Sequence, residues 1–458
     1  MDRPFIFIAA PFEAGSGGMI RDQRVLPHLA RLIIQHTGSK VFVEVPFSHI
    51  RFMMAGLAES IGVDGAEDEM LRKIEQSVAV LQTSGITLDV ADWVAMVHRA
   101  AASLRRIRDS YSLRILDRKI LSFGPFNIPL TEQYDRATSE NSRLFRTYGG
   151  RPFLYSCHED WTAIRLTQSL AKKFSSDCAV LLQNSPYGYG GIHSHKIFTD
   201  FSSLMVYDRT KNLYNNLIRE RYLRVVLSVS PAPLTDASQF DQVVKRYKVP
   251  IRILNPAVSF DKKLMEHRYK VKTSDAVFFA RLSPEKGIYD LLAIWKIVNT
   301  LSPRSNLRIY GSFHSDKHAK FFVQRLNSLR TDCLEMKGFV PNRRDLFREV
   351  SMARVLVYPS YSDAFPLVIL ESLALGLAVV AYDIPAITHA FAGLAPVFLA
   401  RRGDIRGMAE LVSKVIAMTD DEFTALHQNE NVQSFLKTHA SWEKVAESEF
   451  ESLVPFIT

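Results

Sequence analysis

Cysteine is scarce in this sequence and its positions are scattered. The 458 residues include three cysteines, Cys157, Cys178 and Cys333. An odd number of widely separated cysteines, with no CxxC spacing, argues against a disulfide framework and against a zinc site, and it favours a reducing compartment.

Long apolar runs are absent as well. No apolar stretch approaches the roughly 18 residues needed to span a bilayer. The run Phe5–Ala10, preceded by Asp2 and Arg3, is too short for the apolar region of a signal peptide. No Gln, Ser or Pro tract marks a long disordered region, and 47% hydrophobic with 23% charged residues is typical of a globular protein. We expect a cytoplasmic protein, soluble or peripheral on the cytoplasmic face of a membrane.

Acidic residues are outnumbered by basic ones, 48 to 57, which gives a net charge of +9. Such an excess favours a polyanionic partner: nucleic acid, anionic lipid headgroups or a phosphorylated substrate. A generic basic surface is the alternative. Nucleic acid is the least favoured of the candidate partners, because the sequence shows no stripe of aromatic and basic residues on predicted strands and no known nucleic-acid-binding module.

Much of the positive charge lies in Trp93–Lys119, within a helical region of about residues 50–150 that does not alternate with strands. Six arginines and one lysine are interleaved there with an apolar stripe that includes Trp93 and Tyr111. Two interpretations stay open: a helix lying in an anionic membrane interface, or a helix packed on its own core with a solvated basic face.

Elsewhere, short apolar runs alternate with helical-period segments, which is the signature of α/β units built on parallel sheets. A chain of 458 residues is too long for one ordinary core. We predict two doubly wound domains, 1–256 with the helical insert and 257–437, with the ligand site in the cleft between them at the carboxyl ends of the strands. The expected strands are Phe5–Ala10, Lys40–Pro46, Phe153–Cys157, Cys178–Leu182, Arg224–Val229, Ile251–Leu254, Ala276–Ala280, Leu307–Tyr310, Arg354–Tyr358 and Ala378–Ala381.

The strongest functional signal begins at residues 277–287, where a buried strand ends at Arg281 and a short loop brings in Lys286 just before a helix. Two cations at a strand-to-helix junction can bind a diphosphate, Arg through its planar guanidinium and Lys as a point charge. Alone, such a pair would be interpreted as solvated surface cations.

Two carboxylates follow in residues 358–376. Asp363 lies in a loop after a predicted strand, and Glu371 lies in the first turns of the next helix. The amides at that helix N-terminus can receive a phosphate. A carboxylate before the helix can accept hydroxyls from a sugar, and one inside it can accept two hydroxyls from a ribose. If Asp363 and Glu371 stood alone, they would be interpreted as a helix-capping residue and a solvated helix residue. Because the loop with Arg281 and Lys286 follows a matching strand, we interpret the carboxylates as part of a binding site.

These motifs resemble the C-terminal domain of retaining GT-B glycosyltransferases, in particular glycosyltransferase family 4, whose domain is called glycosyl transferases group 1. The shared features are the Arg-Leu-x-Pro-Glu-Lys-Gly loop at 281–287, Ile-Tyr-Gly at 309–311, Gly-Phe-Val at 338–340 and the carboxylate-x7-Glu spacing. Residues 441–446 resemble the last helix of the family, which crosses back onto the first domain, here 438–458. The match covers about residues 250–455 and implies the GT-B fold, two Rossmann-like domains facing a central cleft.

The resemblance also implies roles. Arg281 and Lys286 would bind the diphosphate of a nucleotide-sugar donor and steady the leaving group, and Asp363 would contact the transferred sugar. Glu371 would hold the donor ribose. Further donor-side positions are Gly17, Gly18, Gly311, Gly338, Val340, Phe365, Leu367 and Val368.

Two donor-side residues depart from the family. Its first acidic position is normally Glu, one methylene longer than Asp363. Pro366 offers no N–H, so amides for the phosphate must come from its neighbours. On the acceptor side, the His that usually follows the central strand is missing from residues 181–186, which offer Gln183 and Asn184. Acceptor-side candidates are His158, Asn184, His193 and His195; a structural role is the alternative for each His.

The predicted activity is retaining transfer of a sugar from a nucleotide-diphosphate-sugar, by front-face attack and with no metal or cofactor required. The basic surface favours a lipid-linked or membrane-associated glycan as acceptor. Two alternatives stay open: transfer to a soluble sugar or protein, and a non-catalytic nucleotide-sugar-binding subunit of a complex.

Overall fold

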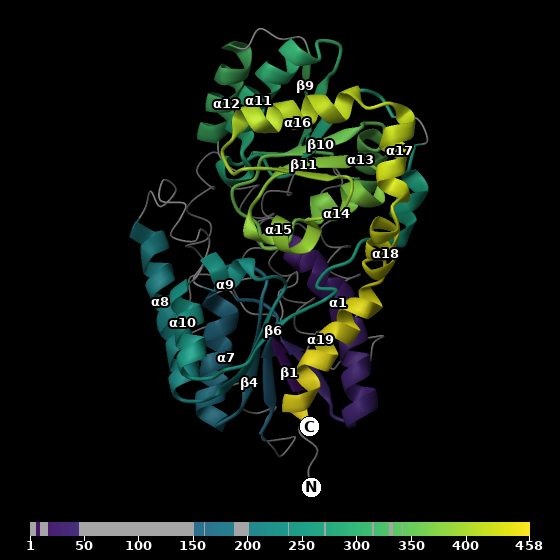
Figure 1. The fold of residues 1–458 in the computed structure, drawn as a ribbon. Helices are drawn as coiled ribbons and strands as arrows, with labels where there is room; N and C mark the ends of the chain where they lie inside the picture. Colours follow the sequence, from purple (N-terminus) through teal and green to yellow (C-terminus); the bar gives the residue numbers. More distant parts are fainter. Residues whose placement is uncertain are drawn as a thin grey trace, which may run out of the picture. The chain divides into compact units, whose positions relative to one another are not determined.

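The structure is a computed structural model, and it describes residues 6–9, 17–44, 151–159, 161–186, 201–236, 238–269, 272–313, 316–328, 333–340 and 342–458. Contacts divide the chain into two compact units (Figure 1). The first unit comprises residues 1–229, 236–254 and 446–458, and the second comprises 230–235 and 255–445.

The first unit is built on a parallel sheet of order β2-β1-β3-β4-β5-β6. Every residue of β3 and β4 is buried, and in β5 every residue but Arg224 is buried, as expected for a parallel sheet covered by helices on both sides. The strands are β1 (Ile6–Ala9), β2 (Val41–Glu44), β3 (Phe153–Ser156), β4 (Cys178–Leu182), β5 (Leu223–Ser228) and β6 (Ile251–Ile253). The helices are α1 (Gly17–Thr37), α7 (Trp161–Phe174), α8 (Phe201–Arg219), α10 (Ser238–Arg246) and most of α19 (Trp442–Ile457). The short α9 (Ala232–Asp236) lies between α8 and α10 in the chain, but most of it belongs to the second unit.

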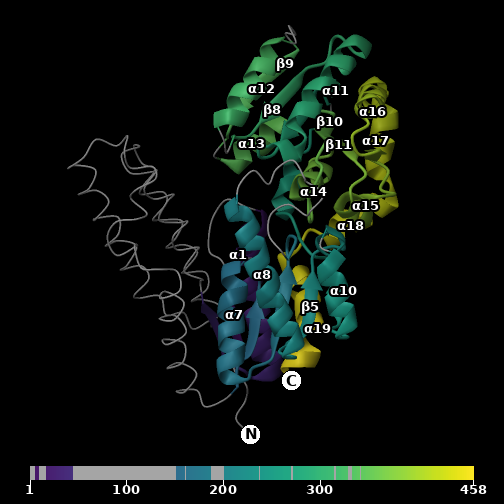
Figure 2. The ribbon, with the colours of Figure 1, turned by 90° about the vertical axis from the view of Figure 1, so that its left-hand side faces the viewer.

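The second unit repeats this plan with a parallel sheet of order β12-β11-β10-β7-β8-β9. Helices cover both faces of the sheet, which Figure 2 shows from the side. The strands are β7 (Ala276–Phe279), β8 (Leu307–Tyr310), β9 (Leu334–Gly338), β10 (Val355–Tyr358), β11 (Ala378–Tyr382) and β12 (Val397–Ala400). The helices are η3 (Lys262–His267), η4 (Pro284–Lys286), α11 (Ile288–Leu301), α12 (Asp316–Ser328), α13 (Arg343–Val350), α14 (Leu367–Ala374), α15 (Pro385–Phe391), α16 (Ile405–Ala417), α17 (Asp420–Gln428) and α18 (Glu430–Thr438).

Each sheet has a topological switch point. In the first, β2 lies on one side of β1 and the chain continues through β3 to β6 on the other. In the second, β8 and β9 lie on one side of β7, and β10 to β12 lie on the other. Loops at the carboxyl ends of strands flanking a switch point diverge, and the crevice between them is where open α/β sheets bind ligands.

The prediction of two doubly wound α/β units is confirmed, and the expected strands lie within two residues of the observed ones. Strands β9 and β12 were not predicted. Both are edge strands, and their side chains are mostly half-buried or exposed. The continuous apolar run that marks a central strand is therefore missing from β9. The helical insert of about residues 50–150, with its basic segment 93–119, lies outside the described residues. Among those that are described, no helix is both long and apolar enough to cross a membrane.

Candidate functional site

The loops that follow β7 and β10 are joined at the switch point of the second sheet. Gly287 has a φ of 71°, and a Cβ there would lie 1.8 Å from the carbonyl oxygen of Pro359. Across the same junction, the Tyr361 amide donates to the Glu285 carbonyl at 2.8 Å. Only glycine allows this approach, so the Gly that closes the predicted cationic loop fixes that loop against the acidic one.

A second glycine fixes the loop after β8. Gly311 has a φ of 142°, and a Cβ there would lie 2.0 Å from the Ala280 carbonyl oxygen. Its amide donates to the Gly338 carbonyl, 2.8 Å away at the end of β9. Gly338 has a φ of 73°, and an added Cβ would meet nothing within 4 Å. The predicted glycines therefore lie at the carboxyl edge of neighbouring strands, where backbone can approach a ligand closely.

Lys286 and Asp363 form the centre of this edge. The Lys286 ammonium donates to Asp363 Oδ2 at 2.7 Å and to the Ser362 carbonyl at 3.3 Å. The Tyr358 hydroxyl donates to the same Oδ2 at 2.6 Å, and the Ala364 amide donates to Oδ1 at 3.1 Å. The structure thus brings together two residues that the sequence placed in separate motifs. Tyr358 was not given a role.

The charges in this cluster are set by its neighbours. Burial alone would lower the pKa of Lys286, but the carboxylate of Asp363 raises it above its usual range, so the ammonium stays charged. An ammonium has three N–H donors, and two are used here.

Arg281 supplies a second cation at this edge. It follows β7 directly, it is exposed, and it has no ion-pair partner among the residues that the structure describes. An exposed guanidinium in the same loop as Lys286 can bind phosphate oxygens in a bidentate manner.

Glu371 lies in α14, which begins at Leu367 after Pro366 at the N-cap position. Its side chain is buried and accepts a hydrogen bond from the guanidinium of Arg343, the first residue of α13. Burial raises the pKa of Glu371, and Arg343 opposes that shift. No sequence motif indicated Arg343, because the contact joins two helices that follow different strands.

The other donor-side positions surround these loops. Val340, Leu367 and Val368 are partly buried against the core of the unit. The ring of Phe365 packs edge-on against Phe391 with the centroids 5.3 Å apart. In the first unit, Gly17 and Gly18 begin α1.

The acceptor-side candidates that can be located lie at the carboxyl edge of the first sheet. His158 follows β3 and is buried, with its Nδ1 3.7 Å from Glu159 Oε2. Gln183 follows β4, and its side-chain amide donates to Asp22 Oδ1 at 2.7 Å and to the Cys157 carbonyl at 2.8 Å. Asn184 is half-buried beside it. His193 and His195 lie outside the described residues.

A sealed cluster of four buried side chains lies in the same unit, and no sequence motif indicated it. Arg21 of α1 is paired with Glu449 of α19, and the Tyr155 hydroxyl donates to Glu449 Oε1 at 2.6 Å. Asp22 Oδ1 lies 3.6 Å from an Arg21 nitrogen. Burial raises the pKa of Asp22 from 3.8 to about 7, against the opposing effect of His158 and Arg21. All four side chains are at most 1% exposed, so the cluster is closed to a substrate.

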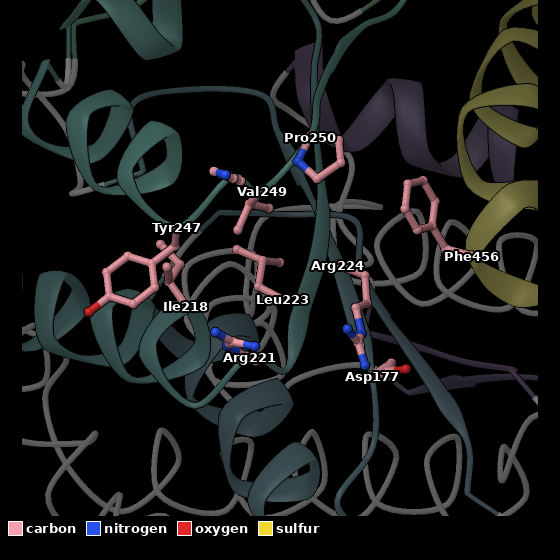
Figure 3. Close-up of a pocket in the computed structure, with 10 residues that line it drawn as sticks. Asp177, Ile218, Arg221, Leu223, Arg224, Tyr247, Val249, Pro250 and Phe456 are labelled. Carbon is pink, nitrogen blue, oxygen red and sulfur yellow. Dashed lines mark ion pairs between the residues drawn. The ribbon is translucent and has the colours of Figure 1, made fainter.

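A hollow of about 600 Å³ lies elsewhere on the first unit (Figure 3). Its lining includes Asp177 just before β4, Pro250 just before β6 and Arg224, the second residue of β5. The Nε atom of Arg224 lies 2.8 Å from Oδ1 of Asp177. These residues mark the amino ends of the strands. The hollow is therefore at the opposite edge from the switch point, and it contains none of the predicted site residues.

Comparison with known proteins matches the second unit to one family. Residues 260–431 match the family described as "Glycosyl transferases group 1". The matched segment contains Arg281, Lys286, Asp363 and Glu371, and it therefore includes the loops at the β7/β10 switch point.

Two curated relatives share part of the chain. An uncharacterized glycosyltransferase of Haemophilus influenzae is 26% identical over 173 residues, which are 37% of this chain and 46% of that protein. The lipopolysaccharide 1,2-N-acetylglucosaminetransferase of Salmonella typhimurium is 27% identical over 181 residues, 37% of this chain and 45% of that protein. The matched regions therefore span about half the length of these relatives.

Solved structures extend the similarity to the whole fold. Anabaena HepE in complex with UDP has a TM-score of 0.62 and 16% identity, covering 99% of this chain and all of that one. HepE has also been solved with UDP-glucose. The sucrose-phosphate synthase of Thermosynechococcus elongatus has a TM-score of 0.53 and 18% identity over 72% of this chain and 80% of that one. The two Rossmann-like units thus have the GT-B fold.

Proposed function

We propose that this protein is a glycosyltransferase that moves a sugar from a nucleotide-diphosphate-sugar to an acceptor. The observation that carries this proposal is the Lys286–Asp363 ion pair at the β7/β10 switch point, with the exposed Arg281 in the same loop as Lys286. A diphosphate needs cations, and a sugar needs a carboxylate that accepts its hydroxyls. The group 1 match and the UDP complexes of HepE support the same assignment.

The proposed chemistry is mainly electrostatic. When the sugar leaves, negative charge grows on the departing diphosphate, and Arg281 with the third N–H of Lys286 offsets it. Preorganised donors of this kind commonly contribute about 10²–10³ in rate each. We propose that transfer retains the anomeric configuration, as in family 4, and that it proceeds without a metal ion. Asp363 is held by Lys286 and Tyr358, so it would face the sugar with its orientation already set.

The proposed acceptor is a lipid-linked or membrane-associated glycan. The net charge of +9 and the Salmonella relative named for lipopolysaccharide support it. A liposome flotation assay that compares neutral with anionic vesicles tests the membrane part, with residues 93–119 as the predicted contact. Equal flotation with both vesicle types would contradict it and favour a soluble sugar or protein as acceptor.

Hydrolysis and transfer assays with UDP-, GDP- and ADP-sugars test the activity, with Arg281→Ala as the key variant. We expect turnover to fall about 10²–10³-fold in this variant, since one transition-state donor is lost. Arg304→Ala is the matched control, because Arg304 is an exposed arginine before β8, at the other end of the same sheet, and it should leave turnover unchanged. Unchanged turnover in Arg281→Ala would refute the assignment, and binding of a nucleotide-sugar without turnover would favour a non-catalytic subunit. Proton NMR of the product reports its anomeric configuration.

A further inference from the structure

The hollow at the amino ends of the first sheet combines apolar and charged side chains (Figure 3). Its volume of about 600 Å³ lies within the range of about 300–1,000 Å³ that is usual for small-molecule sites. Leu223 and Val249 lie close together in the middle of the lining, with Tyr247 on one side and Phe456 on the other. Tyr247 is 39% exposed, so an aromatic ring is open to solvent there. The hollow therefore offers apolar surface that can hold the body of an organic ligand.

The charges of the lining are mostly positive. Among the lining residues that the structure describes, Arg221, Arg224 and Lys248 are cations, and Asp177 is the one carboxylate. Asp177 is paired with Arg224. Arg221 and Lys248 are exposed, and neither has an ion-pair partner in the part of the chain that the structure describes. These two cations are therefore available to an anion from solution.

Arg221 and Lys248 also share an unusual backbone conformation. Each lies two residues after the end of a helix, α8 or α10, and their φ angles are 62° and 56°. In both turns the amide of the next residue, Tyr222 or Val249, donates at 3.0 Å to the carbonyl five residues before it. Glycine is the usual residue at this position, because a Cβ makes the left-handed conformation unfavourable. The protein thus keeps a long cationic side chain at two positions that favour glycine.

The helix ends alone do not account for these two cations. Positive side chains stabilise a helix C-terminus because they offset its partial negative charge. Arg219 already lies in the last turn of α8, and Lys245 and Arg246 lie in the last turn of α10. Helix α7 is also followed by a residue with positive φ, Ser175 at 50°, which is not a cation and does not line the hollow. The cations therefore accompany the hollow and not the turn.

A hollow with cations beside apolar surface suits an anion that is attached to an apolar body. Arginine binds phosphate oxygens through its planar guanidinium and lysine binds them as a point charge, while contact with the apolar side chains removes the body of the ligand from water. We propose that this hollow binds a phosphate group carried on a ring or another apolar body, with Arg221 and Lys248 as the cations that hold the phosphate. The hollow shares no residue with the loops at the β7/β10 switch point, so its ligand is independent of the proposed function.

Calorimetric titration of the full chain with phenyl phosphate and with inorganic phosphate tests the proposal. We expect phenyl phosphate to bind about 10-fold or more tightly than inorganic phosphate, since its ring buries apolar surface. Arg221→Gly and Lys248→Gly each remove one cation and supply the residue that the turn favours. Each should weaken the binding of phenyl phosphate about 10-fold, because a hydrogen bond between charged groups is lost. The free energy of unfolding should stay the same or rise.

Three variants serve as controls. Ser175→Gly changes a turn with positive φ outside the hollow, and Arg219→Gln removes an exposed cation near the end of α8. Arg281→Ala removes a cation at the switch point of the second sheet. All three should bind phenyl phosphate within about 2-fold of the wild type. Weaker binding in Arg281→Ala would show that phenyl phosphate binds at the switch point, and it would overturn the proposal.

Two further results would overturn it. One is unchanged binding of phenyl phosphate in the double variant Arg221→Gly with Lys248→Gly. The other is equal affinity of the wild type for phenyl phosphate and inorganic phosphate, because the apolar lining would then contribute nothing. Flotation with vesicles that contain phosphatidic acid identifies the source of the phosphate. Flotation that weakens in the double variant would indicate a lipid phosphate, and equal flotation of both chains would indicate a soluble one; either supports the proposal when phenyl phosphate binds as expected.

Discussion

Both units place a cation, a carboxylate and a tyrosine in contact beside the sheet, but the two clusters differ in access to solvent. In the first unit Arg21, Glu449 and Tyr155 are at most 1% exposed. In the second unit the side chains of Lys286 and Asp363 are 10% and 16% exposed, and Tyr358 is buried below them. The two clusters therefore contain nearly the same chemical groups, but the charged side chains of the second are partly exposed to solvent and those of the first are not.

This difference separates a structural role from a binding role. In the first cluster Glu449 accepts from Arg21 and from Tyr155, and the surrounding protein leaves no path to a ligand. In the second cluster the Lys286 ammonium donates to Asp363 and to the Ser362 carbonyl, and its side chain stays 10% exposed at the carboxyl edge of the sheet. Clusters of similar composition should therefore respond differently to substitution, one in stability and the other in activity.

The largest effect is expected when the sealed cluster is broken by Glu449→Gln. Arg21 would keep its charge in the interior and lose its main partner, and such losses cost about 3–5 kcal/mol of unfolding free energy. Urea unfolding monitored by circular dichroism measures it. Glu451→Gln serves as control, because Glu451 is an exposed glutamate on the same helix. If Glu449→Gln lost no more unfolding free energy than Glu451→Gln, the buried cluster would not have the structural role that separates it from the open one.

The next effect concerns the open cluster. Lys286→Met should lower transfer by about 10²–10³-fold, because it removes a donor to the leaving diphosphate. Its unfolding free energy should fall by less than half of the Glu449→Gln loss, since Asp363 is partly solvated and keeps the Tyr358 bond. Lys296→Met, at an exposed lysine on the following helix, provides the control. If Lys286→Met lost as much unfolding free energy as Glu449→Gln and kept normal turnover, the open cluster would have a structural role and not a binding role.

A third effect is a pH dependence within the sealed cluster, of which only a part is seen between pH 5 and pH 8. The pKa of Asp22 is raised from 3.8 to about 7 by burial, so the folded state holds a proton there that the unfolded chain has already lost. The stability from that proton is complete below a pH of about 4 and decreases by up to about 1.4 kcal/mol per pH unit until the pH passes about 7.

Asp22→Asn should remove this dependence while it keeps the shape of the side chain. Unfolding free energies of the variant and the wild type, compared at pH 5 and pH 8, measure the difference. Asp177→Asn is the control, because Asp177 belongs to the same unit and its side chain is 44% exposed. Parallel curves for wild type and Asp22→Asn would mean that Asp22 is already ionised at pH 5 in the folded state.

The sequence predicted most of the second unit because its signals are local. Arg281 and Lys286 stand in one loop, Asp363 and Glu371 in another, and both loops follow apolar runs that form buried strands. The glycines of the two motifs are explained by close backbone contacts at Gly287 and Gly311. The sites and roles of these residues remain predictions.

Contacts between segments that are distant in the chain could not be predicted from the sequence. The Arg343–Glu371 pair joins helices from different strands, and Arg21 meets Glu449 across a separation of 428 residues. Neither has a local pattern, because each partner alone is an ordinary charged residue on a helix. Edge strand β9 was missed for a related reason, since its alternating, partly exposed side chains give no continuous apolar run.

The pairing of Arg21 with Glu449 has a consequence for biosynthesis. Domains commonly fold in order as the chain leaves the ribosome. Here α1 is made early, but the carboxylate that neutralises its buried guanidinium is made only after the whole second unit. The first unit therefore cannot reach its native charge balance until α19 has been made. We expect nascent chains that stop before α19 to remain dependent on chaperones and sensitive to proteases, and the arrival of α19 to end that dependence.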